Sequence, residues 1–285
     1  MHIVVAVDWT DQSFSAVKEV VSLYTPDALT LVHAVDFGIL DYPTLGPPMA
    51  DSVSQDMRKA MVDAGHQLLE RTADLVPRSI RSVERLCKPG KPETVILETV
   101  HAGKADLVVT GARGRGRVAE LILGSISHRV LSKAGCPTLL VKGEFRATQR
   151  VLIAVQGRDD AERIQTWLLA HPFKRQTEVS VISVTVAPYI VDPETVASYG
   201  VWGETAKHFA QELAGRVALK LNGLHYLATG RALEGDPVEV ILGEATTHDL
   251  VVIGSHGRTG LDRVLLGSVS HAVVHGAECP VMVIR

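Results

Sequence analysis

The stretch DLVVTGARGR at residues 106–115 returns as DLVVIGSHGR at residues 249–258. The correspondence continues without a gap, because GSISH at residues 124–128 matches GSVSH at residues 267–271. The offset of 143 residues between the two copies is far longer than the period of a solenoid repeat. The repeat therefore indicates duplication of a whole domain.

The length of the chain agrees with a duplication. Its 285 residues exceed the size of an ordinary single domain and favour two. The two copies are separated by a polar stretch at residues 143–149. We therefore expect one domain at residues 1–143 and a second at residues 150–285.

Each copy alternates short apolar runs with amphipathic stretches. Strands that are apolar throughout and alternate with helices are typical of a parallel sheet covered on both faces. We therefore expect two tandem α/β domains, each with a five-stranded, mainly parallel sheet and helices on both faces. The expected strands are 3–7, 29–35, 83–87, 107–110 and 138–141 in copy one, and 151–155, 178–186, 226–228, 250–253 and 281–284 in copy two. The expected helices are 13–24, 54–75, 92–101 and 125–133, and 161–169, 205–221, 237–245 and 269–275.

A proline- and glycine-rich segment at residues 37–52 interrupts this alternation in copy one. We expect it to form a long ordered loop near the carboxyl ends of the strands, where ligands bind in open α/β sheets. Its counterpart at residues 187–202 of copy two has a different composition.

A glycine-rich loop between a parallel strand and a helix suits the binding of anions. Glycine lets the backbone approach a phosphate, and the first N–H groups of the helix point toward it. In copy one these features are the glycines that follow the fourth strand, a serine that serves as helix N-cap or phosphate donor, and local positive charge: Gly111, Gly114, Gly124, Ser125, Arg113 and Arg115. Copy two repeats them with Gly254, Gly257, Arg258, Gly267 and Ser268.

This G-x2-G-x9-G-S motif resembles the ATP-binding motif of the universal stress protein family, in its tandem form. The opening VAVD at residues 5–8, the GKP turn at residues 90–92 and the closing CPTLLV at residues 136–141 also resemble that family. The resemblance implies the adenine nucleotide alpha hydrolase-like variety of Rossmann-like fold. It also implies ATP as ligand, with magnesium as an open addition, and phosphate contacts at the motif glycines and serines.

The resemblance further places the adenosine end of the ligand. It implies that Asp8 lies near the adenosine and that the main chain near Ala34 meets the adenine, with Val184 equivalent in copy two. Copy two departs at one place, because Gln156 stands where copy one has Asp8. We therefore expect tighter ATP binding in copy one, and in copy two a site that is weaker, empty or specific for another phosphorylated ligand.

Rapid catalysis is not indicated by the sequence. No nucleophile and base form a recognisable pair, and the acid pairs Asp8 with Asp11 and Asp159 with Asp160 lack the context of a hydrolase. The histidines and cysteines lack zinc-ligand spacing, so we expect neither a metal site nor a catalytic residue. The expected function is a nucleotide-dependent stress-response or regulatory protein. A slow ATP hydrolase or nucleotidyl-transfer enzyme, and an interaction scaffold with a vestigial nucleotide site, stay open as alternatives.

The composition limits the classes of partner that we expect. The formal net charge of −3 gives no general attraction to nucleic acid or to an anionic membrane, and no run is long enough to span a bilayer. Without a signal-peptide pattern or a disulfide framework, a cytoplasmic location is expected. The apolar last strands at residues 138–141 and 281–284 are expected to pair with each other and make an internal pseudo-dimer. A homodimer and an unknown protein partner stay open.

Overall fold

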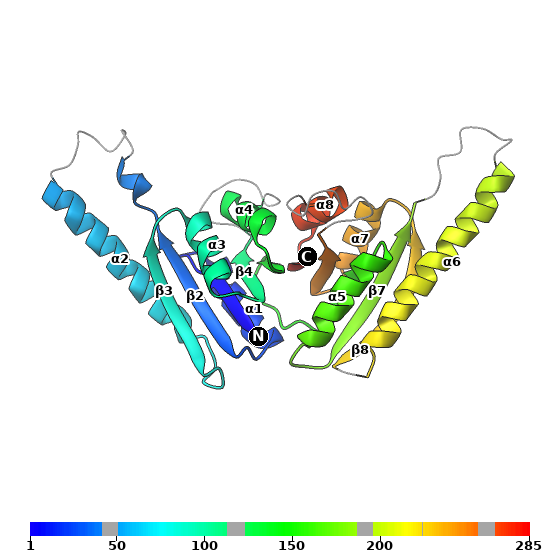
Figure 1. Ribbon diagram of the computed structural model, residues 1–285, viewed down its shortest axis with the longest axis horizontal. Coiled ribbons are helices and arrows are strands. Elements are labelled where there is room, and N and C mark those ends of the chain that lie inside the picture. Colours follow the sequence, from blue (N-terminus) through cyan, green and yellow to red (C-terminus); the bar gives the residue numbers. More distant parts are fainter. Residues whose placement is uncertain (42–50, 113–122, 187–195, 224, 256–265) are drawn as a thin grey trace. The chain divides into compact units, whose positions relative to one another are not determined.

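The chain folds into two compact units (Figure 1). The computed structural model describes residues 1–41, 51–112, 123–186, 196–223, 225–255 and 266–285. Unit 1 comprises Met1–Val21 and Thr25–Phe145, and unit 2 comprises Ser22–Tyr24 and Arg146–Arg285. The domain limits expected from the sequence, 1–143 and 150–285, stay a prediction.

Unit 1 contains a parallel sheet with the strand order β3-β2-β1-β4-β5. The strands are β1 (His2–Ala6), β2 (Ala28–Val35), β3 (Ser82–Pro89), β4 (Leu107–Gly111) and β5 (Thr138–Val141). The helices are α1 (Asp11–Leu23), α2 (Asp51–Ala73), α3 (Pro92–Ala102) and α4 (Ser125–Lys133), with a short 3-10 helix at Phe37–Asp41.

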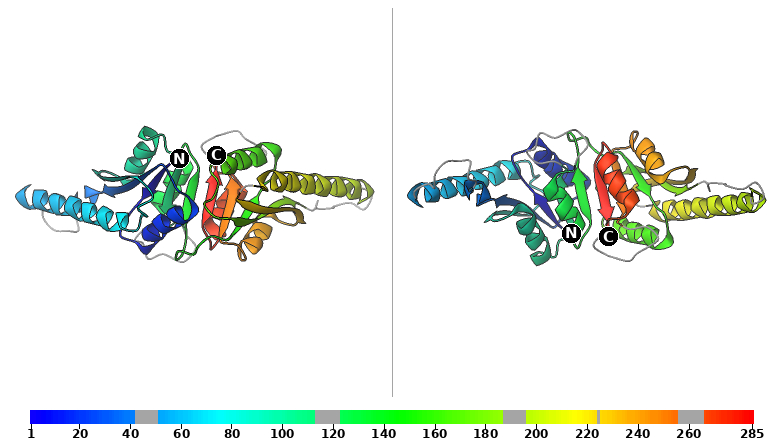
Figure 2. Two further views of the ribbon diagram at one scale, coloured as in Figure 1. Left: turned by 90° about the horizontal axis from the view of Figure 1, so that it is seen from below. Right: turned by 90° about the horizontal axis from the view of Figure 1, so that it is seen from above.

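Apolar side chains of the sheet and of two helices form a core on one face of unit 1. Val4, Val32 and Val108 of the strands pack with Val100 of α3 and Val130 of α4, and all five are buried. Each fully buried valine contributes roughly 1.5–3 kcal/mol relative to an exposed one. Figure 2 shows α1 on the opposite side of this sheet from α3, so both faces are covered.

Unit 2 repeats this architecture, with the parallel strand order β10-β9-β6-β7-β8. The strands are β6 (Arg150–Ala154), β7 (Thr177–Thr185), β8 (Tyr226–Glu234), β9 (Leu250–Gly254) and β10 (Val281–Ile284). The helices are α5 (Arg158–Ala170), α6 (Val196–Leu221), α7 (Pro237–Ala245) and α8 (Ser268–Gly276). The predicted fold class, two tandem α/β domains with mainly parallel sheets, is confirmed.

The largest error in an expected strand concerns β8. It extends to Glu234, whereas the sequence pattern predicted a strand only at residues 226–228. Buried and exposed residues alternate along its first half, and Gly230 and Arg231 interrupt the apolar pattern. An edge strand with one solvent-exposed face tolerates such residues, so the length of an apolar run does not predict the length of the strand.

The expected long loop at residues 37–52 is only partly correct. Phe37–Asp41 forms a 3-10 helix, and α2 already begins at Asp51. In copy two, α6 begins at Val196, inside the counterpart segment 187–202. Residues 42–50 and 187–195 lie outside the described part of the chain.

The turn before α3 in copy one and the turn before α7 in copy two share a backbone feature. Gly90 and Gly235 have φ angles of 142° and 144°, which favour glycine because other residues rarely adopt them. Their N–H groups donate at 3.0 Å to the carbonyls of Val35 in β2 and Thr185 in β7, the strands that pair with β3 and β8. Among the residues that the structure describes, no helix combines the length and the apolarity required to cross a bilayer.

Candidate functional site

The strand order places the candidate site at the carboxyl edge of each sheet. In unit 1 the chain builds β1, β2 and β3 outward in one direction and then adds β4 on the other side of β1. In unit 2, β6 and β9 are neighbours in the same way. Ligands of open α/β sheets bind at such a reversal of strand order, outside the carboxyl ends of the strands.

Asp8 shapes the turn between β1 and α1. Its Oδ1 accepts hydrogen bonds from the backbone N–H of Thr10, at 3.0 Å, and from the Thr10 hydroxyl. Ser13 Oγ donates to the Asp8 carbonyl at 2.6 Å and to the Thr10 carbonyl at 3.0 Å. Asp8 is half-buried, so its carboxylate is held by its own turn and still reaches solvent.

Ala34 lies near the carboxyl end of β2, where it is half-buried. Its neighbour His33 places Nδ1 2.8 Å from the carbonyl oxygen of Val7. This hydrogen bond joins β2 to the residue that precedes Asp8. The two residues assigned to the adenosine end therefore share one edge of unit 1.

The first glycine of each motif has a packing reason. A Cβ added to Gly111 would lie 3.1 Å from the Cβ of Gln12, because the start of α1 approaches this point closely. A Cβ added to Gly254 would overlap the carboxyl group of Asp160 in α5. Close packing of the helix that follows the first strand of each copy therefore favours glycine at both positions, whether or not a phosphate is bound.

Hydrogen bonds close the base of the glycine loop in unit 1. The N–H of Gly124 donates to the carbonyl of Ala112 at 2.7 Å, so the two ends of the loop meet. Ser127 Oγ donates to the carbonyl of Gly111 at 2.6 Å and holds α4 against the end of β4. We call these two contacts the neck of the loop. Arg113, Gly114 and Arg115 lie outside the described residues.

Ser125 is not the N-cap of α4, which corrects one of its two expected roles. Gly124 is the N-cap, and Ser125 is the first residue of the helix, with an exposed side chain. No side chain makes a capping hydrogen bond there. The first N–H groups of a helix have no carbonyl partner inside the helix, so this end of α4 is suited to an anion.

Unit 2 has the same neck with closely similar distances. Gly267 N–H donates to the carbonyl of Ser255 at 2.8 Å, and Ser270 Oγ donates to the carbonyl of Gly254 at 2.7 Å. Gly267 is the N-cap of α8 and Ser268 is its first residue. Gly257 and Arg258 lie outside the part of the chain that the structure describes.

A cavity of about 280 Å³ opens at this edge of unit 2. Apolar side chains of β7, α7 and β9 form much of its wall, including Ile182, Ile241 and Ile253. Gln156 and Asp160 line the cavity. So do all the described residues that the sequence assigns to the second site: Val184, Gly254, Gly267 and Ser268. The structure thus brings the described residues of the second candidate site together around one space.

Among the described residues that line this cavity, only Asp160 has an ionisable side chain. It is 7% exposed, and burial raises its pKa to about 6, against smaller lowering effects of Arg163 and of the Gln156 backbone N–H. Arg163 Nη2 comes within 3.5 Å of Oδ1, too far for a good hydrogen bond. No donor among the described residues makes a hydrogen bond to Oδ1.

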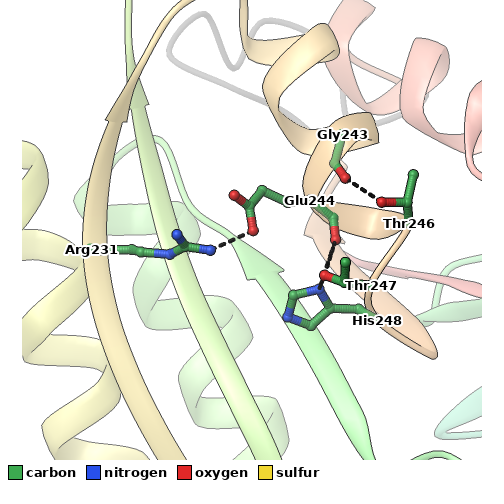
Figure 3. A network of polar contacts seen from close by, with 6 residues as sticks. All are labelled: Arg231, Gly243, Glu244, Thr246, Thr247 and His248. Carbon is green, nitrogen blue, oxygen red and sulfur yellow. Dashed lines mark hydrogen bonds and ion pairs between the residues drawn. The ribbon is translucent and has the colours of Figure 1, made fainter.

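Polar contacts fix α7, which forms one wall of the cavity. Figure 3 shows Glu244 of α7 accepting a hydrogen bond from Arg231 of β8. After the helix ends, Thr246 Oγ1 donates to the carbonyl of Gly243 at 2.7 Å, and His248 Nδ1 lies 2.8 Å from the carbonyl of Glu244. The last carbonyls of the helix gain partners in this way, which holds its end in place.

Sequence reasoning missed two features of these sites. The neck serines Ser127 and Ser270 received no role, although they recur at the same offset as the glycines. Asp160 was considered only as half of an acid pair. The available signal was its place in the first turn of α5, four residues after Gln156, the position where copy one has a carboxylate.

The fold and these edges define an α/β protein with two Rossmann-like units, each with a candidate site at the reversal of its strand order. Comparison with known proteins agrees with this class. The sequence pattern of the Universal stress protein family matches residues 1–142 and again residues 147–285.

Relatives of similar length exist in mycobacteria. A universal stress protein of Mycolicibacterium smegmatis is 30% identical over 296 residues, covering 99% of this chain and 96% of the relative. One from Mycobacterium tuberculosis is 27% identical, covering 90% and 87%. The crystal structure of a universal stress protein from Archaeoglobus fulgidus superimposes with a TM-score of 0.65 at 18% identity, covering 100% of this chain and 98% of that one. The chain belongs to the universal stress protein family, as a stress-response protein with two tandem family domains.

Proposed function

We propose that unit 1 binds ATP and that the protein acts in the stress response through this nucleotide. The observation that carries the proposal is the closed loop base between β4 and α4, which holds the N-terminus of α4 at the carboxyl end of β4, the strand that pairs with β1. Gly111, Gly124 and Ser125 stand at the phosphate end of this proposed site, together with Arg113, Gly114 and Arg115. Asp8 and the main chain near Ala34 stand at the nucleoside end.

The chemistry of both ends supports this assignment. The free N–H groups and the exposed Ser125 hydroxyl of α4 can donate to phosphate oxygens, and the helix dipole favours negative charge there. The Asp8 carboxylate can accept from a ribose hydroxyl, because its own turn fixes it without burying it. A magnesium ion bound with ATP would neutralise part of the phosphate charge.

For unit 2 we propose a second ligand site, made by Val184, Gly254, Gly267 and Ser268 with Gly257 and Arg258. Its anion-binding helix end matches that of unit 1, whereas its nucleoside end does not, because Gln156 replaces Asp8. We expect ATP to bind more weakly here than in unit 1. A different phosphorylated ligand is then the better candidate.

Titration calorimetry with ATP tests the first site. Asp8→Ala removes a charged hydrogen bond worth about 1.5–3 kcal/mol, so the affinity should fall roughly ten- to a hundred-fold. Gly114→Val should crowd the phosphate and weaken binding as well. Asp11→Ala is the matched control, because it removes an exposed carboxylate from the same turn.

Melting curves of all variants separate loss of binding from loss of the fold. If Asp8→Ala and Gly114→Val both bind ATP as the unchanged chain does, the proposed site is wrong. Chromatography of the bound nucleotide over hours distinguishes a slow hydrolase, which forms ADP, from a binding protein, which does not.

A further inference from the structure

The cavity of unit 2 contains a carboxyl group that its first strand does not supply. In unit 1 the acidic residue follows the strand, at Asp8, and Gln12 stands four residues later, at the start of α1. In unit 2 the order is reversed, with Gln156 after the strand and Asp160 four residues later, in the first turn of α5. The cavity of unit 2 has therefore not lost a carboxyl group but carries it at another point of its wall.

The position of Asp160 sets what can approach Gly254. Its carboxyl group fills the space beside the Gly254 Cα that any other residue would need for a side chain. Its Oδ1 is fully buried, lines the cavity and lacks a hydrogen bond from the described residues. A buried carboxylate oxygen without a hydrogen-bond donor is costly, so a ligand that supplies a donor to Oδ1 gains the corresponding free energy.

Charge decides which ligands fit this end of the cavity. Among the described residues around the carboxylate, those that line the cavity are apolar or neutral, and the charged group beside it is Arg163 from the same helix. An anion placed against Gly254 would meet a negative charge in apolar surroundings, where like charges repel more strongly than in water. A hydroxyl or amino group at the same place would meet a strong acceptor.

We propose that Asp160 determines the specificity of unit 2, which selects a ligand that donates a hydroxyl or amino hydrogen to Asp160 and rejects one that puts phosphate against Gly254. Any phosphate of that ligand would lie at the other end of the cavity, at the N-terminus of α8. This inference rests on the proposed ligand site of unit 2 and is independent of ATP binding in unit 1.

The experiment uses the full chain with the first site blocked by Gly114→Val, and compares Asp160 with Asp160→Asn. The asparagine has the same shape, so the packing against Gly254 is kept while the charge is removed. Calorimetric titrations use adenosine, which carries hydroxyl and amino donors without charge, and inorganic phosphate. Asp159→Asn is the matched control, because it removes an exposed carboxylate from the adjacent position.

The affinities of the two probes should respond differently to Asp160→Asn. Asp160→Asn should weaken adenosine binding roughly ten- to a hundred-fold and leave phosphate binding equal or tighter. With Asp160 present, adenosine binding should also weaken below about pH 6, where the carboxyl group is neutral, and this dependence should vanish in Asp160→Asn.

Two outcomes would contradict the proposal, and they differ in what they overturn. If adenosine and phosphate respond alike to Asp160→Asn, the specificity role is wrong while unit 2 stays a ligand site. If neither probe binds the blocked chain, the ligand site proposed for unit 2 fails together with this inference. Melting curves of Asp160→Asn show whether any loss of adenosine binding comes from unfolding.

Discussion

Asp160→Asn should stabilise unit 2 at neutral pH. Burial raises the pKa of Asp160 from 3.8 to about 6, so the folded state holds its proton more tightly than the unfolded chain does. Between these values stability falls as the pH rises, because ionising the buried carboxyl group costs about 1.4 kcal/mol for each pKa unit. The full cost above pH 7 is about 3 kcal/mol, and asparagine should recover most of it.

The pH dependence of this gain distinguishes it from a general packing effect. At pH 8 the gain from Asp160→Asn should be about 3 kcal/mol, and at pH 5 roughly half of that, because much of the native Asp160 is then protonated. Urea unfolding followed by tryptophan fluorescence measures it. A Trp9→Phe background restricts the signal to unit 2, because the remaining tryptophans are Trp167 and Trp202.

Asp159→Asn is again the control and should change stability by less than about 1 kcal/mol, with little dependence on pH, since Asp159 is exposed. Equal stabilities of the native chain and Asp160→Asn at pH 8 would refute the argument from burial. A gain that is the same at pH 5 and pH 8 would refute the assignment of the gain to ionisation.

Two further substitutions test the packing of unit 2 by urea unfolding. Gly230→Ala should destabilise it by more than about 2 kcal/mol, because the added Cβ would overlap the backbone of Ala214 in α6. The Cβ added by Gly243→Ala meets no atom within 4 Å, so this variant should stabilise α7 by about 0.5–1 kcal/mol. If both variants lose stability, the argument from overlap is contradicted. Asp236→Ala should cost about 1 kcal/mol, because the carboxylate caps two N–H groups of α7, at 2.9 and 3.0 Å. Lys91→Ala, at the equivalent uncapped position before α3, should cost little, and equal losses would show that the cap is not the cause.

The repeated glycine motif and the apolar central strands were enough to predict the fold. Strands such as Thr138–Val141 and Val281–Ile284 match the expected limits because they are buried throughout, so the apolar run in the sequence has the same length as the strand. The edge strand β8 was predicted too short, because its solvent-facing residues do not form an apolar run. Pattern reasoning is therefore most accurate where burial is uniform.

The candidate sites could be predicted in part. The glycines and serines were found because both copies keep them, whereas Asp160 was missed because it has no acidic counterpart in copy one. Two acids in the first turn of a helix have an ordinary explanation in the helix dipole. Only the packing of α5 against β9 shows that Asp160 faces the cavity while Asp159 faces solvent.

The neck has a consequence for how such a protein can change over generations. Its contacts join residues on either side of the glycine loop and use mainly backbone groups, so they place few demands on the sequence between them. Lengthening a loop whose ends are already tied together adds little conformational entropy cost. New loop sequences can therefore be tried by mutation, or grafted by an engineer, without endangering the sheet. A duplicated gene with this construction can acquire a second binding preference in one half while the other half keeps the first.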